Sequence, residues 1–572
     1  MLTGLAGTGL SAVYVALKGL PGTRGRLPDS LMPPAWLEAR PAALRAADGG
    51  GFGNRDESFA RATSALEGRT SSLSASTAPT LVFPTAGEAA RATKVTVPTV
   101  LATGDPALHL LRRTTFGPTP ALVDEVHASG IDPWLDAQLA PETLADGEAD
   151  GVWALYPRAA MAPEQVRRNV ERYAWEAMAE YGRATLARQI WSTRQLYEVM
   201  VDLWANHLNV PMPSGPAWDV GVSYHNDVIR THALGSFTDM LLAAMRHPAM
   251  LRYLSNDQST RKAVNENLGR ELLELHTIGV GSGYTETDVR NSAYILTGRT
   301  VANGKDNGAE GTFLYDPERH WTGPVAAAGF RHDNGDPGGG LALSDAYLRH
   351  LASLPATAHT IARKIAVRFV ADDPPPELVE RLAGAYLEGG TQIVPVLRLL
   401  FRSSEFWAAV GQKTRRPLEN LAASARVLGV RPGPGTPKVV ETWYWSAGKM
   451  GHRPLAWPAP NGYPDVRAAW RSSGGLLELW NRHRGLVHGW DEGVTYTPAG
   501  QLADGRPQAT VGEYVDSLCQ RLCFQTFQPH HRDVLAVFAG AGADTPTAQT
   551  RMDELVEHLA PLILDSPYFA LR

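Results

Sequence analysis

The spacing of apolar residues predicts a chain that is helical over most of its length. From about residue 105 onward, apolar positions recur every three or four residues, which is the period of one face of an α-helix. Segments with this spacing are 121–139, 163–209, 226–254, 260–279, 285–297, 345–354, 357–370, 375–388, 392–407, 415–428, 475–489, 510–524, 530–539 and 546–564. We therefore expect an all-α fold, a multi-helix globular array with long loops and at most a small β-hairpin insertion.

Local composition divides the chain into three parts. Residues 1–104 are rich in Gly, Pro, Ser, Thr and Ala, which predicts an irregular N-terminal arm or linker. Residues 105–430 predict a helical core domain that contains a Gly- and Asp-rich loop insertion at 299–345. Residues 431–572 predict a C-terminal region that is helical towards its end. Its first part, 430–475, is expected to be loop-rich because it contains PGPGTP and WPAPNGYPD.

Composition and net charge indicate what kind of protein this is and what it is not expected to bind. Hydrophobic residues make up 44% of the chain and charged residues 20%, which is typical of a packed globular protein. The net charge of −5 provides no basic excess for nucleic-acid binding. No apolar run is long enough to span a bilayer, and the N-terminus lacks the basic region of a signal peptide. Cys519 and Cys523, one helical turn apart, are expected to be two buried thiols.

The densest polar segment is NENLGRELLELHTIGVGSGYTETDV, residues 265–289. On a helix, Arg270, Glu271 and Glu274 fall on one stripe beside buried leucines. Arg270 is four residues from both Glu266 and Glu274, so ion pairs to either carboxylate are expected. A structural network of ion pairs and amides is one interpretation of this stripe, because charge networks often only fix how helices dock.

A divalent metal site is a second interpretation of the same stripe. Carboxylate oxygens and imidazole nitrogens from facing helices are common metal ligands. Glu271 and Glu274 would be joined by His225 and His232, which lie seven residues apart and share a face if their helix is continuous. The metal, if one is bound, is unspecified by the sequence.

A third interpretation is acid–base catalysis by a pair of carboxylates. Glu271 and Glu274 would be the acids, Arg270 would orient them, and His207 or His225 would transfer protons. At the end of the segment, Thr285 is expected to cap the following helix together with Asp288, three residues further on.

Several segments together resemble the bacterial domain of unknown function 1800 family, over about residues 105–572. The segments are RRTTFGPTP (112–120), LYEVMVDLWANHLNV (196–210), HPAMLRYLSN (247–256), residues 265–289, LTGR (296–299), ARKIAVRFVADDPP (362–375), SSEFW (403–407), KTRRPLE (413–419) and APNGYPD (459–465). The resemblance implies an α-helical fold, export to the periplasm or beyond, and a sulfatase-like protein as a possible partner. It implies no reaction.

These observations lead to two functional hypotheses. The first is an exported helical protein with a carboxylate- and histidine-lined pocket built from residues 196–232 and 265–289. This protein would act as a metal-dependent or acid–base enzyme on an extracellular polymer or a small polar substrate. The alternative is a non-catalytic protein that assembles with a secreted sulfatase-like protein or a surface structure.

Overall fold

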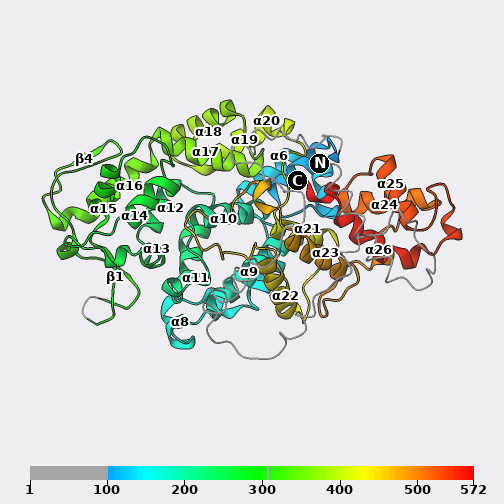
Figure 1. The fold of residues 1–572 in the computed structure, drawn as a ribbon, viewed down its shortest axis with the longest axis horizontal. Coiled ribbons are helices and arrows are strands. Elements are labelled where there is room, and N and C mark those ends of the chain that lie inside the picture. The colour runs from blue at the N-terminus through cyan, green and yellow to red at the C-terminus, as the bar shows by residue number, and fades with distance from the viewer. Residues whose placement is uncertain (1–100, 306–307) are drawn as a thin grey trace, which may run out of the picture. The chain divides into compact units, whose positions relative to one another are not determined.

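The computed structural model describes residues 101–305 and 308–572, and these residues belong to one compact unit. The expected arm at 1–104 lies outside the described residues except for its last four, and the expected domain boundaries at 104 and 430 stay predictions. Within the described part, the predominantly helical fold is confirmed (Figure 1). No described helix is both long enough and apolar enough to cross a membrane.

The first half of the described chain is a series of mostly short helices. The expected stretch 163–209 is three helices, because the chain breaks at 170–175 and again at 192–194. The helices are α4 (Pro106–Thr114), α5 (Pro120–Ser129), α6 (Ile131–Leu139), α7 (Gly147–Trp153), α8 (Pro163–Asn169), α9 (Glu176–Trp191), α10 (Gln195–His207), α11 (Gly221–Ser223), α12 (Phe237–Ala244), α13 (Pro248–Tyr253), α14 (Asn267–Glu271) and α15 (Glu286–Leu296).

Two of these helices continue as π-helices, in which each turn holds more residues than in an α-helix. Residues Tyr224–Arg230 follow α11, and residues Leu272–His276 follow α14. The wider turn changes which side chains share a face, so the expected alignment of His225 with His232 does not form. His225 is buried, whereas His232 is only partly buried.

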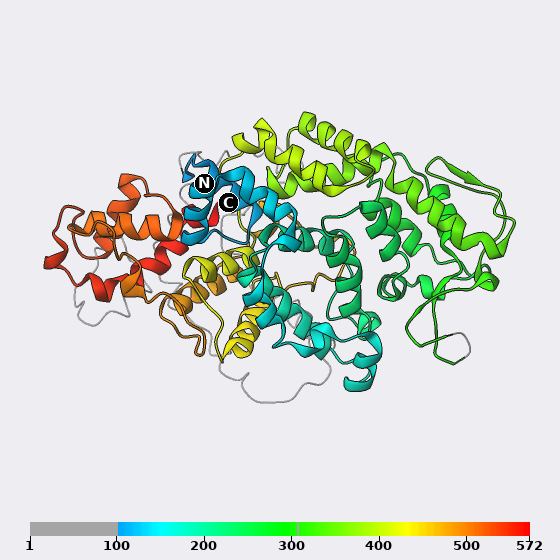
Figure 2. The ribbon, with the colours of Figure 1, turned by 180° about the vertical axis from the view of Figure 1, so that it is seen from behind.

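The expected insertion at 299–345 contains two small antiparallel hairpins and the start of a helix. Strand β1 (Arg299–Val301) pairs with β2 (Phe313–Tyr315), and β3 (Val325–Ala327) pairs with β4 (Phe330–His332). Helix α16 begins at residue 340, five residues before the expected end of the insertion. The β3–β4 hairpin lies beside α15 and α16, whereas β1 lies against α13 (Figures 1 and 2).

The second half contains longer amphipathic helices. They are α16 (Gly340–Ala352), α17 (Pro355–Phe369), α18 (Pro376–Glu388), α19 (Ile393–Arg402), α20 (Ser404–Ala408), α21 (Pro417–Val427), α22 (Thr436–Lys449), α23 (Ser473–Val487), α24 (Val511–Cys523), α25 (Pro529–Phe538), α26 (Met552–Leu564) and α27 (Pro567–Ala570). Cys519 and Cys523 are both free and buried in α24, as expected.

Residues 430–475 were expected to be loop-rich, and they also contain helix α22. The prolines of PGPGTP suggested a loop, but Pro437 occupies the first turn of the helix. Proline is favoured at that position because its missing N–H group would be unpaired there in any residue. Trp443 and Tyr444 of this helix are fully buried, so α22 contributes to the core.

Candidate functional site

The acidic stripe, which runs along α14 and the π-helical turn after it, lies at the protein surface. Arg270 contacts Glu274 at 3.4 Å, Glu266 at 3.6 Å and Glu286 of α15 at 2.6 Å. The Arg270 side chain is 32% exposed, Glu274 is 23% exposed and Glu286 is 71% exposed. The expected ion pairs to Glu266 and Glu274 are therefore present, and water screens them.

Glu271 lies beside this cluster and is partly buried. Burial, and after it the negative charge of Glu274, raises the pKa of Glu271. Neither Glu271 nor Glu274 lines the large cavity described below. The catalytic roles assigned to these carboxylates and to Arg270 stay predictions.

The histidines expected to complete a metal site lie apart from these acids. His225 packs against Tyr224 and Tyr181, with ring centroids 5.4 Å and 5.7 Å away, and burial lowers its pKa to about 3. His232 is partly buried and stands near Asp239. Among the described residues, no three His, Cys, Asp or Glu side chains are grouped so that they could hold a metal ion. Metal binding through Glu271, Glu274, His225 and His232 stays a prediction.

A cavity of about 620 Å³, which we call the central pocket, lies next to α10 and α17. Of the residues expected at a site, His207 lines it. The other walls are the glycine-rich loop after residue 277, Arg416 and the loop after α22. The lining residues are Asp202, Leu203, Asn206, His207, Ile278, Gly279, Val280, Gly281, Ser282, Ala356, His359, Thr360, Arg363, Lys364, Val367, Arg368, Arg416, Asn461, Tyr463, Pro464 and Asp465.

Helix α17 presents one complete stripe of residues to this pocket. Thr360, Arg363, Lys364 and Val367 recur at the three- and four-residue spacing that aligns side chains along a helix face. The opposite stripe, which includes Ile361, Ile365 and Phe369, is fully buried in the core. Thr360 also donates a hydrogen bond of 3.1 Å to the carbonyl oxygen of Ile278, which attaches the glycine-rich loop to the helix.

The glycine in this attachment permits a close approach. Gly279 has a φ of +91°, and a Cβ atom there would lie 2.8 Å from the Thr360 hydroxyl oxygen. Any other residue would be strained by both the backbone conformation and the contact. The loop therefore runs against α17 and forms part of the rim of the pocket, where Gly281, Ser282, His359 and Arg363 are exposed.

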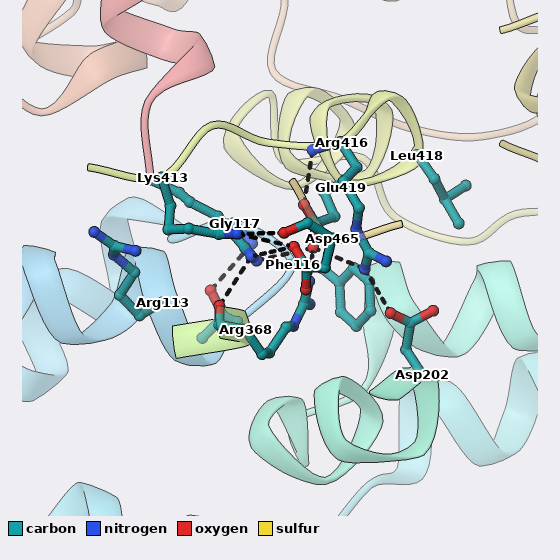
Figure 3. Close-up of polar contacts among 12 residues, drawn as sticks. Arg113, Phe116, Gly117, Asp202, Arg368, Lys413, Arg416, Leu418, Glu419 and Asp465 are labelled. Carbon is teal, nitrogen blue, oxygen red and sulfur yellow. Dashed lines mark hydrogen bonds and ion pairs between the residues drawn. The ribbon is translucent and has the colours of Figure 1, made fainter. Parts of the chain in front are cut away.

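One wall of the pocket belongs to a network of ion pairs centred on the buried Glu419, which we call the central ion network (Figure 3). Glu419 accepts hydrogen bonds from Arg368, from Arg416 at 3.0 Å and from Arg572 at 2.8 Å. Burial alone would raise the pKa of Glu419, but these three guanidinium groups hold it well below its usual range. Glu419 is thus a buried carboxylate that stays ionised because its neighbours compensate it.

Three more carboxylates complete the network. Asp202 contacts Arg416 at 2.5 Å, and Asp372 contacts Lys413 at 2.8 Å. Asp465 contacts Lys413 at 3.1 Å, Arg572 at 3.3 Å and Arg368 at 3.4 Å. These contacts join four cations, Arg368, Lys413, Arg416 and Arg572, to four carboxylates, Asp202, Asp372, Glu419 and Asp465. The central ion network is electrically balanced within itself.

Lys364 is a cation of the pocket that this network does not compensate. Its side chain is partly buried on the stripe of α17, and it makes no hydrogen bond or ion pair with any other described residue. Burial lowers the pKa of Lys364 from 10.5 to about 8. Lys413 differs, because two carboxylates surround its ammonium group. The excess positive charge of the pocket is therefore located at Lys364.

Two buried imidazoles stand close to this lysine. His207 donates through Nε2 to the carbonyl oxygen of His276 at 3.1 Å, and His276 donates through Nδ1 to the carbonyl oxygen of His207 at 2.9 Å. Burial, followed by the charge of Lys364, lowers the pKa of His207 well below its usual value. Burial likewise lowers the pKa of His276 to about 4. Both rings are neutral, so neither adds charge to the pocket.

Sequence reasoning placed His207 at a site but missed Lys364 and the central ion network. A signal was present, because four of the segments that carry the family resemblance contain Lys364 and every member of the network except Arg572. LYEVMVDLWANHLNV contains Asp202. ARKIAVRFVADDPP contains Lys364, Arg368 and Asp372, KTRRPLE contains Lys413, Arg416 and Glu419, and APNGYPD contains Asp465. Their repeated charges far apart in the chain could have been interpreted as one assembled site.

Comparison with known proteins agrees with that resemblance. No curated protein and no solved structure is significantly similar to the chain. A family model described as a protein of unknown function, DUF1800, matches residues 109–571. This match includes every described helix from α5 onward and all residues of the central pocket. The chain therefore belongs to the DUF1800 family.

Proposed function

We propose that this protein binds a small, negatively charged molecule in the central pocket. The observation that supports the proposal is the position of Lys364, an uncompensated cation on the wall of a cavity that reaches the surface. The lining contains four cationic side chains, Arg363, Lys364, Arg368 and Arg416, but only two carboxylates, Asp202 and Asp465. Both carboxylates are paired with arginines.

The energetics favour an anion over a neutral ligand. A cation that is partly removed from water without a counter-charge is held at a cost in stability. An anion bound at Lys364 would offset that cost, because charges attract more strongly in a cavity of low dielectric constant than in water. Arg363 would add attraction at the rim, since its nearest carboxylate, Asp373, is exposed and 4.0 Å away.

The size and lining of the pocket fit a small molecule. Its volume of about 620 Å³ lies within the range of known small-ligand sites. Leu203, Ile278, Ala356 and Val367 provide apolar surface, which would exclude water from a bound ligand. A bound anion would therefore meet both a charge and a partly dry wall, as ligands do in most small-molecule sites.

The proposal is tested by measuring how anions change thermal stability. Phosphate, sulfate and malonate, compared with chloride at equal ionic strength, are expected to raise the melting temperature of the full chain. With a ligand at ten times its Kd, the stabilisation is about 1.4 kcal/mol, or roughly 1–2 °C for a chain of this size. In the variant Lys364→Met, the rise should disappear.

The control for this test is Lys438→Met, which removes an exposed lysine on α22. It should leave the effect of each anion unchanged. An equal rise in Lys364→Met and the unsubstituted chain would contradict the proposal, because the anions would then act elsewhere.

Other parts of the sequence-based hypotheses stay predictions. Export and a sulfatase-like partner are supported by what the family resemblance implies. Acid–base or metal-dependent catalysis is supported by the presence of two acids three residues apart, Glu271 at the end of α14 and Glu274 in the π-helical turn that follows. A pocket for a small polar substrate, bounded on one side by His207, is the part of those hypotheses that the present proposal takes further.

A further inference from the structure

We propose that Lys364 is a carbonyl-reactive amine, which condenses with the aldehyde or ketone group of an anionic substrate. The inference rests on the proposed function, because it places the reaction in the same pocket. It goes beyond binding in assigning a covalent chemistry to one side chain and a substrate class to the site.

The surroundings of Lys364 are those of a reactive lysine. An amine attacks carbonyl carbon only in its neutral form, and proteins favour that form by removing the amine from water and from carboxylates. Lys364 lies on the wall of the central pocket, on the stripe of α17 that also carries Thr360 and Val367. It has no hydrogen-bonding or ionic partner among the described residues. The pKa of about 8 that results from burial leaves a usable neutral fraction near pH 7.

The charged and titratable groups around the amine keep this arrangement intact. The two carboxylates of the lining are engaged by arginines, so neither is available to hold the ammonium form. The neighbouring imidazoles are neutral and donate their protons to backbone carbonyl groups. The groups concerned are Asp202 and His207 of α10, His276, the α17 residues His359, Arg363 and Arg368, Arg416 and Asp465.

The reaction is balanced without any redox partner. The lone pair of Nζ forms a bond to the carbonyl carbon, the π electrons of the carbonyl move to its oxygen, and that oxygen takes up a proton. The nitrogen loses a proton to water, which reaches the pocket through its exposed rim. The hydroxyl group then takes back a proton from that water and leaves as a water molecule, while the lone pair of nitrogen forms the C=N bond of a protonated imine that joins Lys364 to the substrate.

The charge of the pocket limits which carbonyl compounds would react. Once Lys364 is neutral or bound as an imine, Arg363 is the lining cation with the weakest pairing, since Asp373 lies 4.0 Å away and is exposed. A carboxylate or phosphate on the substrate would pair with it. The substrate class is therefore an oxo acid, or a sugar aldehyde that carries an acidic group.

The test is reductive trapping with glyoxylate, a small anionic aldehyde. The full chain is incubated with glyoxylate and cyanoborohydride at about pH 7.5, and modified lysines are located by peptide mass spectrometry. A lysine with a pKa of about 8 has a neutral fraction roughly a hundredfold above that of an ordinary lysine at this pH. We expect Lys364 to be modified at least about tenfold faster than the exposed Lys438, allowing for the lower nucleophilicity that accompanies a lower pKa.

Three controls separate this inference from the proposed function. Phosphate should slow the modification of Lys364 but not of Lys438, and uncharged propionaldehyde should react at Lys364 more slowly than glyoxylate does. The variant Lys364→Arg keeps the cation, so anions should still stabilise it, while trapping at position 364 is lost.

Equal modification rates at Lys364 and Lys438 would overturn the proposal that Lys364 is a reactive amine, even if anions still stabilise the protein. Rapid modification of Lys364 with no preference for glyoxylate and no protection by phosphate would support that proposal. It would also overturn anion binding.

Discussion

Two clusters of charge in this protein look alike in composition and differ in physical setting. The cluster around Arg270 on α14 is a short, local set of side chains at the surface, with Glu286 71% exposed. The central ion network is buried, with the side chains of Arg368 and Glu419 only 2% and 3% exposed. The first is visible in one sequence segment, and the second is assembled from distant parts of the chain.

The comparison teaches that the density of charged residues along a sequence does not indicate where charge matters most. In water, an ion pair contributes little because solvent screens it and the long side chains lose freedom. In the interior, a carboxylate left without its partner costs several kcal/mol, so every member of a buried network is needed. Three predictions, from the largest expected effect to the smallest, test this difference.

The largest effect is expected from Glu419→Gln. This change removes the charge that compensates Arg368, Arg416 and Arg572, and breaking a buried pair costs about 3–5 kcal/mol. Urea denaturation should show that loss in the free energy of unfolding. The matched variant Glu274→Gln, at the surface, should change it by less than about 0.5 kcal/mol. Equal effects of the two substitutions would contradict the comparison.

A smaller effect is expected from mild acid, through the buried imidazoles beside the pocket. The folded-state pKa values of His207 and His276 lie below the unfolded value of about 6.5. The unfolded chain therefore binds more protons, and stability falls as the pH drops below about 6.5. From about pH 7 to 5.5, this pair alone should cost about 2 kcal/mol in the free energy of unfolding.

The variant His207→Gln checks the origin of that loss. It should reduce the fall in stability over the same pH range by about 1 kcal/mol. If the free energy of unfolding stays constant from about pH 7 to 5.5, the two imidazoles are not held neutral in the folded protein. The claim that His207 and His276 add no charge beside the pocket would then be wrong.

The smallest effect is a gain in stability from Lys364→Met. The folded-state pKa of this lysine is below its unfolded value, so its charged form is disfavoured in the folded protein. Removing it should stabilise the chain near pH 7 by about 1–2 kcal/mol, a figure reduced for the partial exposure of the side chain. The gain should shrink as the pH rises from about 8 to 10.5, because the unsubstituted chain then recovers stability.

Lys438→Met is the control, with an expected change near zero because Lys438 is exposed. A loss of stability in Lys364→Met at neutral pH would mean that the ammonium group of Lys364 makes favourable contacts in the folded protein. That result would contradict the claim that this charge is uncompensated.

Much of the fold follows from local sequence. The capping box of Thr285 and Asp288 forms as expected, and helix α15 begins directly after it. The apolar spacing in 357–370 corresponds to α17 within two residues at its start and one at its end. These features depend on contacts between residues a few positions apart, and such contacts are encoded in the local pattern.

Features that depend on the rest of the chain could not be predicted in the same way. The π-helical turns at residues 224–230 and 272–276 shift side chains from the faces that an α-helix would give them. Arg572 reaches Glu419 across 153 residues of chain. Lys364 differs from an exposed lysine through its surroundings, and the residues that surround it come from distant parts of the chain.

The central claim, that an anion binds at Lys364, is tested most directly by titration calorimetry. Phosphate is titrated into the full chain and into Lys364→Met and Lys438→Met at constant ionic strength. The account predicts saturable binding of one phosphate per chain to the unsubstituted protein and to Lys438→Met, with binding to Lys364→Met weakened at least about tenfold, or by about 1.4 kcal/mol. Equal affinity in all three proteins, or no saturable binding in any of them, would contradict it.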